Sequence, residues 1–427
     1  MSQTLKAVRG TRDLLPPETA LWNRIEATAR SVFARYNFGE IRTPVFEDTS
    51  LFARGVGEET DIVSKEMYTW EDRARAQSEK TQTLTLRPEN TAGVVRAYIE
   101  HGLGESGQLQ KLYYIGPQFR RERPQKGRYR QFSQIGAEVI GPPSAGSESP
   151  LRDAEVLEML ATLLDELGIT GWTLHLNSVG SAADRARYND TLRAALAPVV
   201  GQMCVDCQRR AETNPLRVLD CKVPADQPII DTLPVIADSL DEASKAHFAA
   251  VTAALDAASV PYTRNHRLVR GLDYYTRTTF EFTHGGLGAQ NALLGGGRYD
   301  GLSEMIGGPK APGIGFAMGE DRLVLTLLAQ ETALAQKADA FIAPLGEEMN
   351  AAALNLAREL RHQGLWVELG EGSFRLKKSF EAADKTARQI VILGEDELKS
   401  GILTVKNFST GIQTKVPRAE LAVFLSN

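Results

Sequence analysis

The sequence predicts a mixed α/β protein, in which an antiparallel sheet flanked by helices is followed by a smaller α/β domain. Three observations carry this prediction. Two apolar segments at 111–119 and 131–140 enclose a basic loop, a pattern typical of an antiparallel hairpin. Amphipathic helical patterns, such as 151–168, surround this hairpin. Strand and helix patterns alternate after residue 336, which indicates a parallel sheet with right-handed crossovers.

Changes in composition along the chain suggest its domain organisation. Residues 1–326 are predicted to form the main domain, and an Ala-, Asp- and Arg-rich helical insertion at 182–258 interrupts it. An Ala- and Gln-rich linker is predicted at 327–336, before a second domain at 337–427. A chain of 427 residues can bury a core in each of these parts.

Overall composition excludes several classes of protein. The net charge of −5 means that the protein as a whole does not attract nucleic acid, so any RNA contact needs local basic patches. No run approaches the ~18 apolar residues of a membrane span. The first residues lack the apolar segment of a signal peptide, and three cysteines do not make a disulfide framework. We therefore expect a cytoplasmic protein that does not contact membranes.

The basic loop and the strand after it are the most informative stretch. Pro124 and Gly127 interrupt the loop, and six basic residues face one acid: Arg120, Arg121, Arg123, Lys126, Arg128 and Arg130 against Glu122. Side chains of a strand alternate, so Phe132, Gln134 and Glu138 share one face over roughly 20 Å. This face could form the floor of a pocket for two ligands, or it could be an exposed strand below a solvated loop. Arg120 is expected beside Gln134 across the hairpin.

A second polar group stands where the predicted strand TLTLRPENTAG meets a helix. It comprises Glu89, Asn90 and Thr91. These residue types commonly cap helix N-termini, where a cap contributes about 1 kcal/mol. The alternative is that Glu89 pairs with an ammonium group of a ligand.

Three further patterns suggest ligand sites only weakly. The run of glycines at 295–297 permits close backbone approach, but the Walker pattern is absent. Glycines at 313–319 begin inside a predicted strand, which is the wrong order for a dinucleotide-binding fingerprint. Cys204, Cys207 and Cys221 supply three thiols, whereas tetrahedral zinc needs four ligands and no histidine is nearby in the sequence. We therefore predict free thiols and no metal at these cysteines.

Several motifs together carry a family resemblance. FRRERPQKGRYRQFSQIGAEVIG, residues 119–141, resembles motif 2 of class II aminoacyl-tRNA synthetases in its histidyl-tRNA synthetase form. LVRGLDYYTRTTFE at 268–281 and ALLGGGRYDGL at 292–302 resemble two peptides peculiar to that family. PGIGFAMGEDRL at 312–323 resembles motif 3, although the family more often has Glu at the position of Asp321. LRPENT matches the family pattern LRPExT, and the helix and strand over 18–47 resemble motif 1.

The resemblance implies a histidine–tRNA ligase that activates L-histidine with ATP and Mg²⁺ and transfers it to tRNA(His). It also implies a class II antiparallel sheet, a homodimer built on motif 1 and a C-terminal anticodon-binding domain. The implied catalytic residues are Arg120, Gln134 and Arg270. The implied histidine-binding residues are Glu89, Asn90, Thr91, Arg120, Gln134, Glu138, Arg270, Tyr274 and Tyr275. The implied ATP-binding residues are Arg120, Arg128, Phe132 and Arg322.

One alternative shares the same catalytic fold, namely the synthetase-like regulatory subunit of ATP phosphoribosyltransferase. That protein lacks the anticodon-binding domain and usually loses the arginines of the active site. Arg120, Arg270 and Arg322 are all present here, and an α/β module follows residue 336. Both features favour the ligase.

Overall fold

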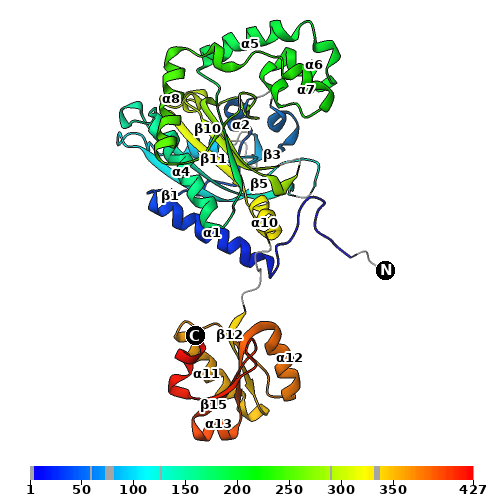
Figure 1. Cartoon of the computed structure of the whole chain (residues 1–427), viewed down its shortest axis with the longest axis vertical. Coiled ribbons are helices and arrows are strands. Elements are labelled where there is room, and N and C mark those ends of the chain that lie inside the picture. The colour runs from blue at the N-terminus through cyan, green and yellow to red at the C-terminus, as the bar shows by residue number, and fades with distance from the viewer. Residues whose placement is uncertain are drawn as a thin grey trace. The chain divides into compact units, whose positions relative to one another are not determined.

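The chain forms two compact units, Met1–Thr332 and Ala333–Asn427, in the computed structural model (Figure 1). The structure describes residues 4–57, 60–72, 81–125, 127–288, 291–330 and 337–426. None of the helices within these ranges is both long and apolar enough to cross a membrane.

A largely antiparallel sheet forms the centre of the first unit. In the described residues it has eight strands in the order β1-β5-β6-β11-β10-β9-β7-β8. Only the outer pairs β1–β5 and β7–β8 are parallel. The strands are β1 (Gly39–Glu40), β5 (Gln110–Phe119), β6 (Gln131–Ile140), β7 (Trp172–Ser178), β8 (Thr263–Arg264), β9 (Thr276–His284), β10 (Ala292–Arg298) and β11 (Gly313–Gly319). The sheet confirms the predicted fold class.

Helices with one apolar face pack on this sheet. In α1 (Glu18–Arg35), the buried side chains include Trp22, Ile25 and Phe33, which recur at helical spacing. This helix contacts α4 (Pro150–Glu166) and α10 (Glu320–Ala329), and α10 also contacts β6. Two other helices, α2 (Thr49–Val56) and α3 (Thr91–Glu100), precede the insertion, and α9 (Leu302–Met305) lies between β10 and β11.

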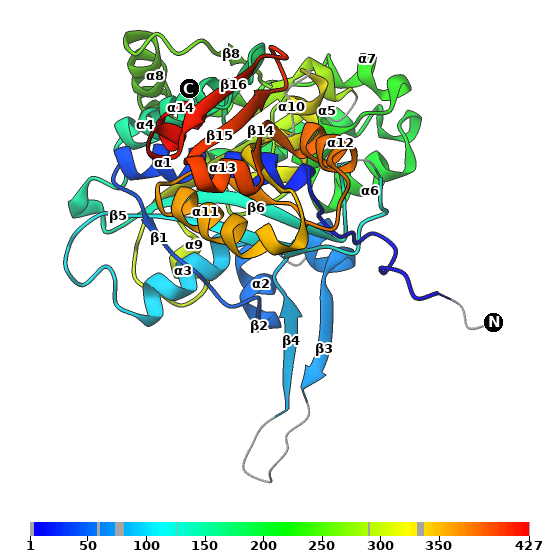
Figure 2. The ribbon, with the colours of Figure 1, turned by 90° about the horizontal axis from the view of Figure 1, so that it is seen from below.

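The segment 40–47, for which the sequence predicts a single strand, is divided between two sheets. Residues Gly39–Glu40 form β1, whereas β2 (Phe46–Asp48) pairs with β4 (Gln82–Leu86) in a small sheet. Pro44 lies between them and has no N–H to donate to a ladder. Figure 2 shows β4 and its partner β3 (Tyr68–Asp72) extending away from the large sheet. Residues 73–80, between β3 and β4, lie outside the described residues.

The insertion consists of helices connected by irregular segments and 3₁₀ turns. Its helices are α5 (Ala182–Leu196), α6 (Val205–Thr213), α7 (Gln227–Ile230) and α8 (Glu242–Ala257), and Figure 1 shows α5, α6 and α7 gathered at one end of the unit. Tyr188 is fully buried at the centre of this region and donates a hydrogen bond to the carbonyl of Pro234, 2.6 Å away. The same apolar cluster continues into Tyr274, Tyr275 and Tyr299. The insertion and the central sheet therefore share one core.

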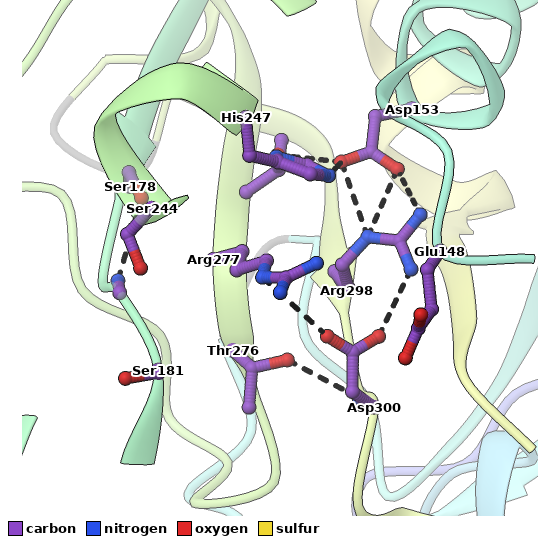
Figure 3. Close-up of polar contacts among 12 residues, drawn as sticks. Glu148, Asp153, Ser178, Ser181, Ser244, His247, Thr276, Arg277, Arg298 and Asp300 are labelled. Atoms are coloured by element: carbon purple, nitrogen blue, oxygen red, sulfur yellow. Dashed lines mark hydrogen bonds and ion pairs between the residues drawn. The ribbon is translucent and has the colours of Figure 1, made fainter. Parts of the chain in front are cut away.

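A buried charged network joins the insertion to the sheet (Figure 3). Arg298 at the end of β10 and Asp153 on α4 are both fully buried, with 3.1 Å between Nε and Oδ1. Arg298 also donates to Asp300 at 2.9 Å. His247 on α8 lies 3.6 Å from Asp153, and burial lowers the pKa of this histidine. Sequence reasoning did not single out this network, which ties α4, α8 and β10 together.

The second unit contains a mixed sheet. In the part of it that the structure describes, five strands run in the order β13-β12-β14-β15-β16. The predicted parallel pairs β12–β13 and β12–β14 are present, and an antiparallel edge follows. Its elements are β12 (Ala338–Pro344), α11 (Asn350–His362), β13 (Val367–Leu369), α12 (Leu376–Thr386), β14 (Ala387–Leu393), α13 (Glu395–Ser400), β15 (Ile402–Asn407), β16 (Gln413–Pro417) and α14 (Leu421–Ser426).

The predicted linker overlaps a helix at its start. Helix α10 continues through Ala329, because Leu323, Val324 and Leu327 remain buried along its face. Residues 331–336 of that linker lie outside the described residues.

Candidate active site

A cavity lies on the central sheet, above β6, β10 and β11. All of the predicted site residues except Asn90 and Glu138 line it: Glu89, Thr91, Arg120, Arg128, Phe132, Gln134, Arg270, Tyr274, Tyr275 and Arg322. Additional lining comes from Tyr114, Glu122, Tyr129, Leu293, Gly295, Phe316 and Asp321, among others. Segments far apart in the sequence therefore build one site.

Three arginines reach this cavity from three separate elements. Arg120 directly follows β5, Arg270 lies in the loop before β9, and Arg322 belongs to the first turn of α10. The Arg322 guanidinium donates to the carbonyl of Ala292 at 2.6 Å. A guanidinium keeps its charge and grips phosphate oxygens with a planar fork. The cavity can therefore present fixed positive charge to an anionic ligand from several sides.

The expected position of Arg120 beside Gln134 is wrong. In the hairpin, Gln134 pairs with Gly116, and the backbone N–H of Arg120 donates to the carbonyl of Arg130. The Arg120 guanidinium instead lies over the ring of Phe132, 5.3 Å from the ring centre. A long side chain can reach a residue that is not its partner across the hairpin, so the strand pairing alone did not determine this contact.

Arg270 occupies a position that depends on a glycine. Its Nη1 donates to Glu281 at 2.7 Å, and the guanidinium lies directly against Gly295 of β10. Any side chain at residue 295 would overlap it. The glycines 295–297 form part of β10 and do not form a phosphate-binding loop. They allow side chains from the 268–281 peptide to lie across the sheet.

Glu89 caps a helix, as one of the two sequence alternatives predicted, and its pairing with a ligand ammonium group stays a prediction. Its carboxylate accepts the backbone N–H groups of Thr91 at 2.7 Å and Ala92 at 3.0 Å, which caps α3. The same carboxylate lines the cavity, and burial raises its pKa. Asn90 does not line the cavity, since its side-chain oxygen accepts a hydrogen bond from Thr43 at 2.5 Å.

Glu138 is fully buried behind the cavity wall. It accepts hydrogen bonds from Thr91 Oγ1 at 2.7 Å and from the Tyr299 hydroxyl at 2.8 Å. Burial raises its pKa to about 8. Tyr299 was missed as an individual residue, although it lies within the 292–302 peptide. An acidic pair, Glu89 and Glu138, thus stands on either side of Thr91.

Arg12 is a second residue that the sequence did not reveal. It donates to Glu18 and, at 2.9 Å, to Asp321 at the start of α10. Its guanidinium also lies 4.9 Å from the centre of the Tyr129 ring. The N-terminal segment is thereby connected to the helix that carries Arg322. No sequence signal links positions 12 and 321, because their contact depends only on the tertiary fold.

Comparison with family profiles identifies the family of the chain. The family profile described as histidyl-tRNA synthetase matches residues 10–323. The chain belongs to the histidyl-tRNA synthetase family. A profile described as anticodon binding domain matches residues 339–427. Members of this family are aminoacyl-tRNA ligases, and the chain carries both of the parts that the resemblance predicted.

Individual relatives cover almost the whole chain. A histidine–tRNA ligase of Koribacter versatilis is 73% identical over 424 residues, which is 99% of this chain and 96% of the relative. The histidine–tRNA ligase of Solibacter usitatus is 56% identical over 99% of each chain. The apo crystal structure of S. aureus histidyl-tRNA synthetase matches with a TM-score of 0.79 and 37% identity, covering 99% of this chain and 100% of that one. The anticodon-binding unit and these relatives favour the histidyl-tRNA synthetase family over the regulatory subunit.

Proposed function

We propose that the protein is a histidine–tRNA ligase, which activates L-histidine with ATP and then transfers it to the terminal ribose of tRNA(His). The observation that carries this proposal is the convergence of Arg120, Arg270 and Arg322 on a cavity that also holds Glu89. The three arginines would pair with the phosphates of ATP and with the carboxylate of histidine. Glu89 would pair with the α-ammonium group of histidine. ATP is accordingly a substrate of the proposed reaction.

The arginines would lower the barrier for attack of one anion on another. In activation, the histidine carboxylate attacks the α-phosphorus of ATP, and pyrophosphate leaves. Arg120 and Arg270 would hold the α-phosphate and the carboxylate, since preorganised charge stabilises a transition state in a water-poor site. Gln134, the third catalytic residue that the resemblance implies, lines the same wall. Arg322 and Phe132 would stack on the adenine, and Arg128 would hold the outer phosphates.

Histidine recognition would use the polar groups around Thr91. Glu89, Thr91 and Gln134 would bind the α-ammonium group, and Asn90 would support that region from outside the cavity. Tyr275 would be a partner of one imidazole nitrogen, with Tyr274 adjacent, and Glu138 would reach the other nitrogen by turning from its present partners Thr91 and Tyr299. Such a site can reject an apolar analogue by about 10⁴-fold, because the buried polar groups would be left unpaired. The proposal therefore needs no editing domain.

Magnesium would accompany the phosphates of ATP. Mg²⁺ is usually held by one or two carboxylates together with substrate phosphates. Glu122 offers such a carboxylate on the cavity wall, 3.1 Å from Arg128. When bound, the ion would neutralise phosphate charge.

We also propose that the C-terminal unit binds the anticodon stem-loop of tRNA(His). The homodimer and the cytoplasmic location stay predictions.

Pyrophosphate exchange with each of the twenty amino acids tests the proposed substrate. Exchange that depends on histidine alone is the expected result, and exchange with a different amino acid would contradict it. Arg270→Ala should slow histidine-dependent exchange by about 10²-fold or more, the cost of losing one transition-state contact. Arg267→Ala is the matched control, since Arg267 lies on the same loop but pairs with the exposed Asp231. Near-normal exchange by Arg270→Ala would exclude Arg270 from the mechanism.

A further inference from the structure

The insertion brings four metal-binding side chains together. The ligand atoms of Cys204, Cys207, Cys221 and Asp226 all lie within 4.8 Å of one another. Cys207, Cys221 and Asp226 are buried, and Cys204 is partly buried. We propose that these four residues bind one zinc ion that has a structural role in the insertion. The absence of a fourth ligand argued against metal in the sequence, and the structure supplies one in Asp226.

The distances suit a tetrahedral ion. Zinc binds thiolate sulfur at ~2.3 Å and carboxylate oxygen at ~2.0–2.2 Å, so two sulfurs of a tetrahedral site lie about 3.8 Å apart. The Sγ atoms of Cys204 and Cys221 are 3.9 Å apart, and Cys221 Sγ lies 3.2 Å from Asp226 Oδ2. Four protein ligands leave no open position, which is typical of structural zinc rather than catalytic zinc.

Local backbone structure holds the ligands in place. Cys204 is the N-cap of α6, Cys207 lies in its first turn, and Cys221 and Asp226 each end a 3₁₀ turn. The backbone N–H of Cys204 donates to both oxygens of Asp226, at 3.1 and 3.2 Å. The N–H of Val223 donates to Cys221 Sγ at 3.4 Å. Such contacts orient ligands and offset their charge, so Asp226 already points at the thiols.

The ligand types select the metal. Three thiolates favour soft ions, and a tetrahedral set of this kind favours zinc over magnesium or calcium, which prefer oxygen ligands. Binding would replace the three thiol protons by one Zn²⁺ and release those protons to solvent. The resulting unit of one dication and four anionic ligands carries two net negative charges. The N–H groups at the start of α6 offset part of this charge.

The ion would hold a segment that contacts the 268–281 peptide. Between Cys207 and Cys221, Asn214 donates to Asp273 at 3.0 Å, and Arg217 lies 3.6 Å from Asp61. Asp273 immediately precedes Tyr274 and Tyr275 on the cavity wall. Apart from α6, this segment has only 3₁₀ turns, so a metal crosslink would constrain it where regular structure is short. The zinc site would therefore stabilise the support behind the active site.

The chain offers a direct test, because the three cysteines of its sequence are all proposed ligands. Protein purified without chelators should contain about one zinc per chain by elemental analysis. The native thiols should react slowly with a thiol reagent and become reactive after a chelator removes the metal. Cobalt(II) added to the reduced apo-protein should give the intense visible absorption of a tetrahedral thiolate complex.

Variants then test the carboxylate ligand. Asp226→Asn should weaken zinc binding more than tenfold, whereas Asp206→Asn should leave it unchanged. Asp206 is a suitable control because it lies between Cys204 and Cys207 but its side chain is 70% exposed. Equal zinc affinity in both variants would remove Asp226 from the site. Metal content is measured without any reaction, so it is independent of the proposed ligase activity.

The wild-type chain alone can overturn the proposal, even if a variant fails to fold. No stoichiometric metal after growth with zinc, together with no cobalt spectrum, would exclude the site. A disulfide between Cys204 and Cys221 in the purified protein, found by mass spectrometry, would exclude it as well.

Discussion

Gly315 on β11 lies directly opposite Glu138 on β6, and a methyl group at residue 315 would overlap the Glu138 carboxylate. The glycine therefore leaves the space in which the acid is buried. Gly315→Ala should push Glu138 away from Thr91 and cost a hydrogen bond to histidine of ~0.5–1.5 kcal/mol. We expect the KM for histidine in pyrophosphate exchange to rise several-fold, up to about tenfold.

Gly39→Ala provides the control for this substitution. Gly39 is in the same sheet, and no atom lies within 4 Å of an added Cβ there. Its KM should match that of the wild type. An unchanged KM in a folded Gly315→Ala variant would show that the position of Glu138 does not affect histidine binding.

Burial of Glu138 should make stability depend on pH. Its pKa is about 8 in the folded protein and near 4.5 when exposed, so the folded state binds the proton more tightly. Stability from this group is fully present below pH 4.5 and decreases as pH rises toward 8. Glu138→Gln removes the titration. The Tm of the variant relative to the wild type should therefore increase between pH 5 and pH 8.5. A Tm difference that is constant over this range would contradict the raised pKa.

The buried pair of Arg298 and Asp153 should be costly to break. Asp153→Asn leaves the Arg298 charge buried, with Asp300 as its one remaining acidic partner among the described residues, and such losses cost about 3–5 kcal/mol. Thermal unfolding should show a clear fall in Tm. Asp190→Asn, which removes an exposed partner of Arg193 in the insertion, should change Tm little. Equal Tm values for the two variants would indicate that the network in Figure 3 contributes no net stability.

A chain that ends at Gln330 should separate the two steps of the proposed reaction. The first unit has its own core and contains every residue of the candidate cavity, so histidine-dependent exchange should persist. Aminoacylation of tRNA(His) should fall strongly, because the C-terminal unit is the proposed anticodon reader. Exchange and aminoacylation would be measured on the same preparation. Full aminoacylation by this shortened chain would show that the C-terminal unit does not contribute to tRNA binding.

The sequence by itself determined the fold class, the β5–β6 hairpin, the alternating C-terminal unit and the family. These features rest on local periodicity and on motifs, which neighbouring residues encode together. Most of the predicted site residues also line one cavity, because the motifs that carry them belong to one family pattern. Their individual roles remain proposals.

Only the tertiary structure decided the contacts between distant segments. It placed Arg120 over Phe132, connected Arg12 to Asp321, enclosed Glu138 behind Thr91 and brought Asp226 to the three cysteines. The physical reason is that burial and side-chain direction depend on which elements pack together. A single aspartate in an irregular segment carries no periodic signal, and its role appears only when the chain folds around it.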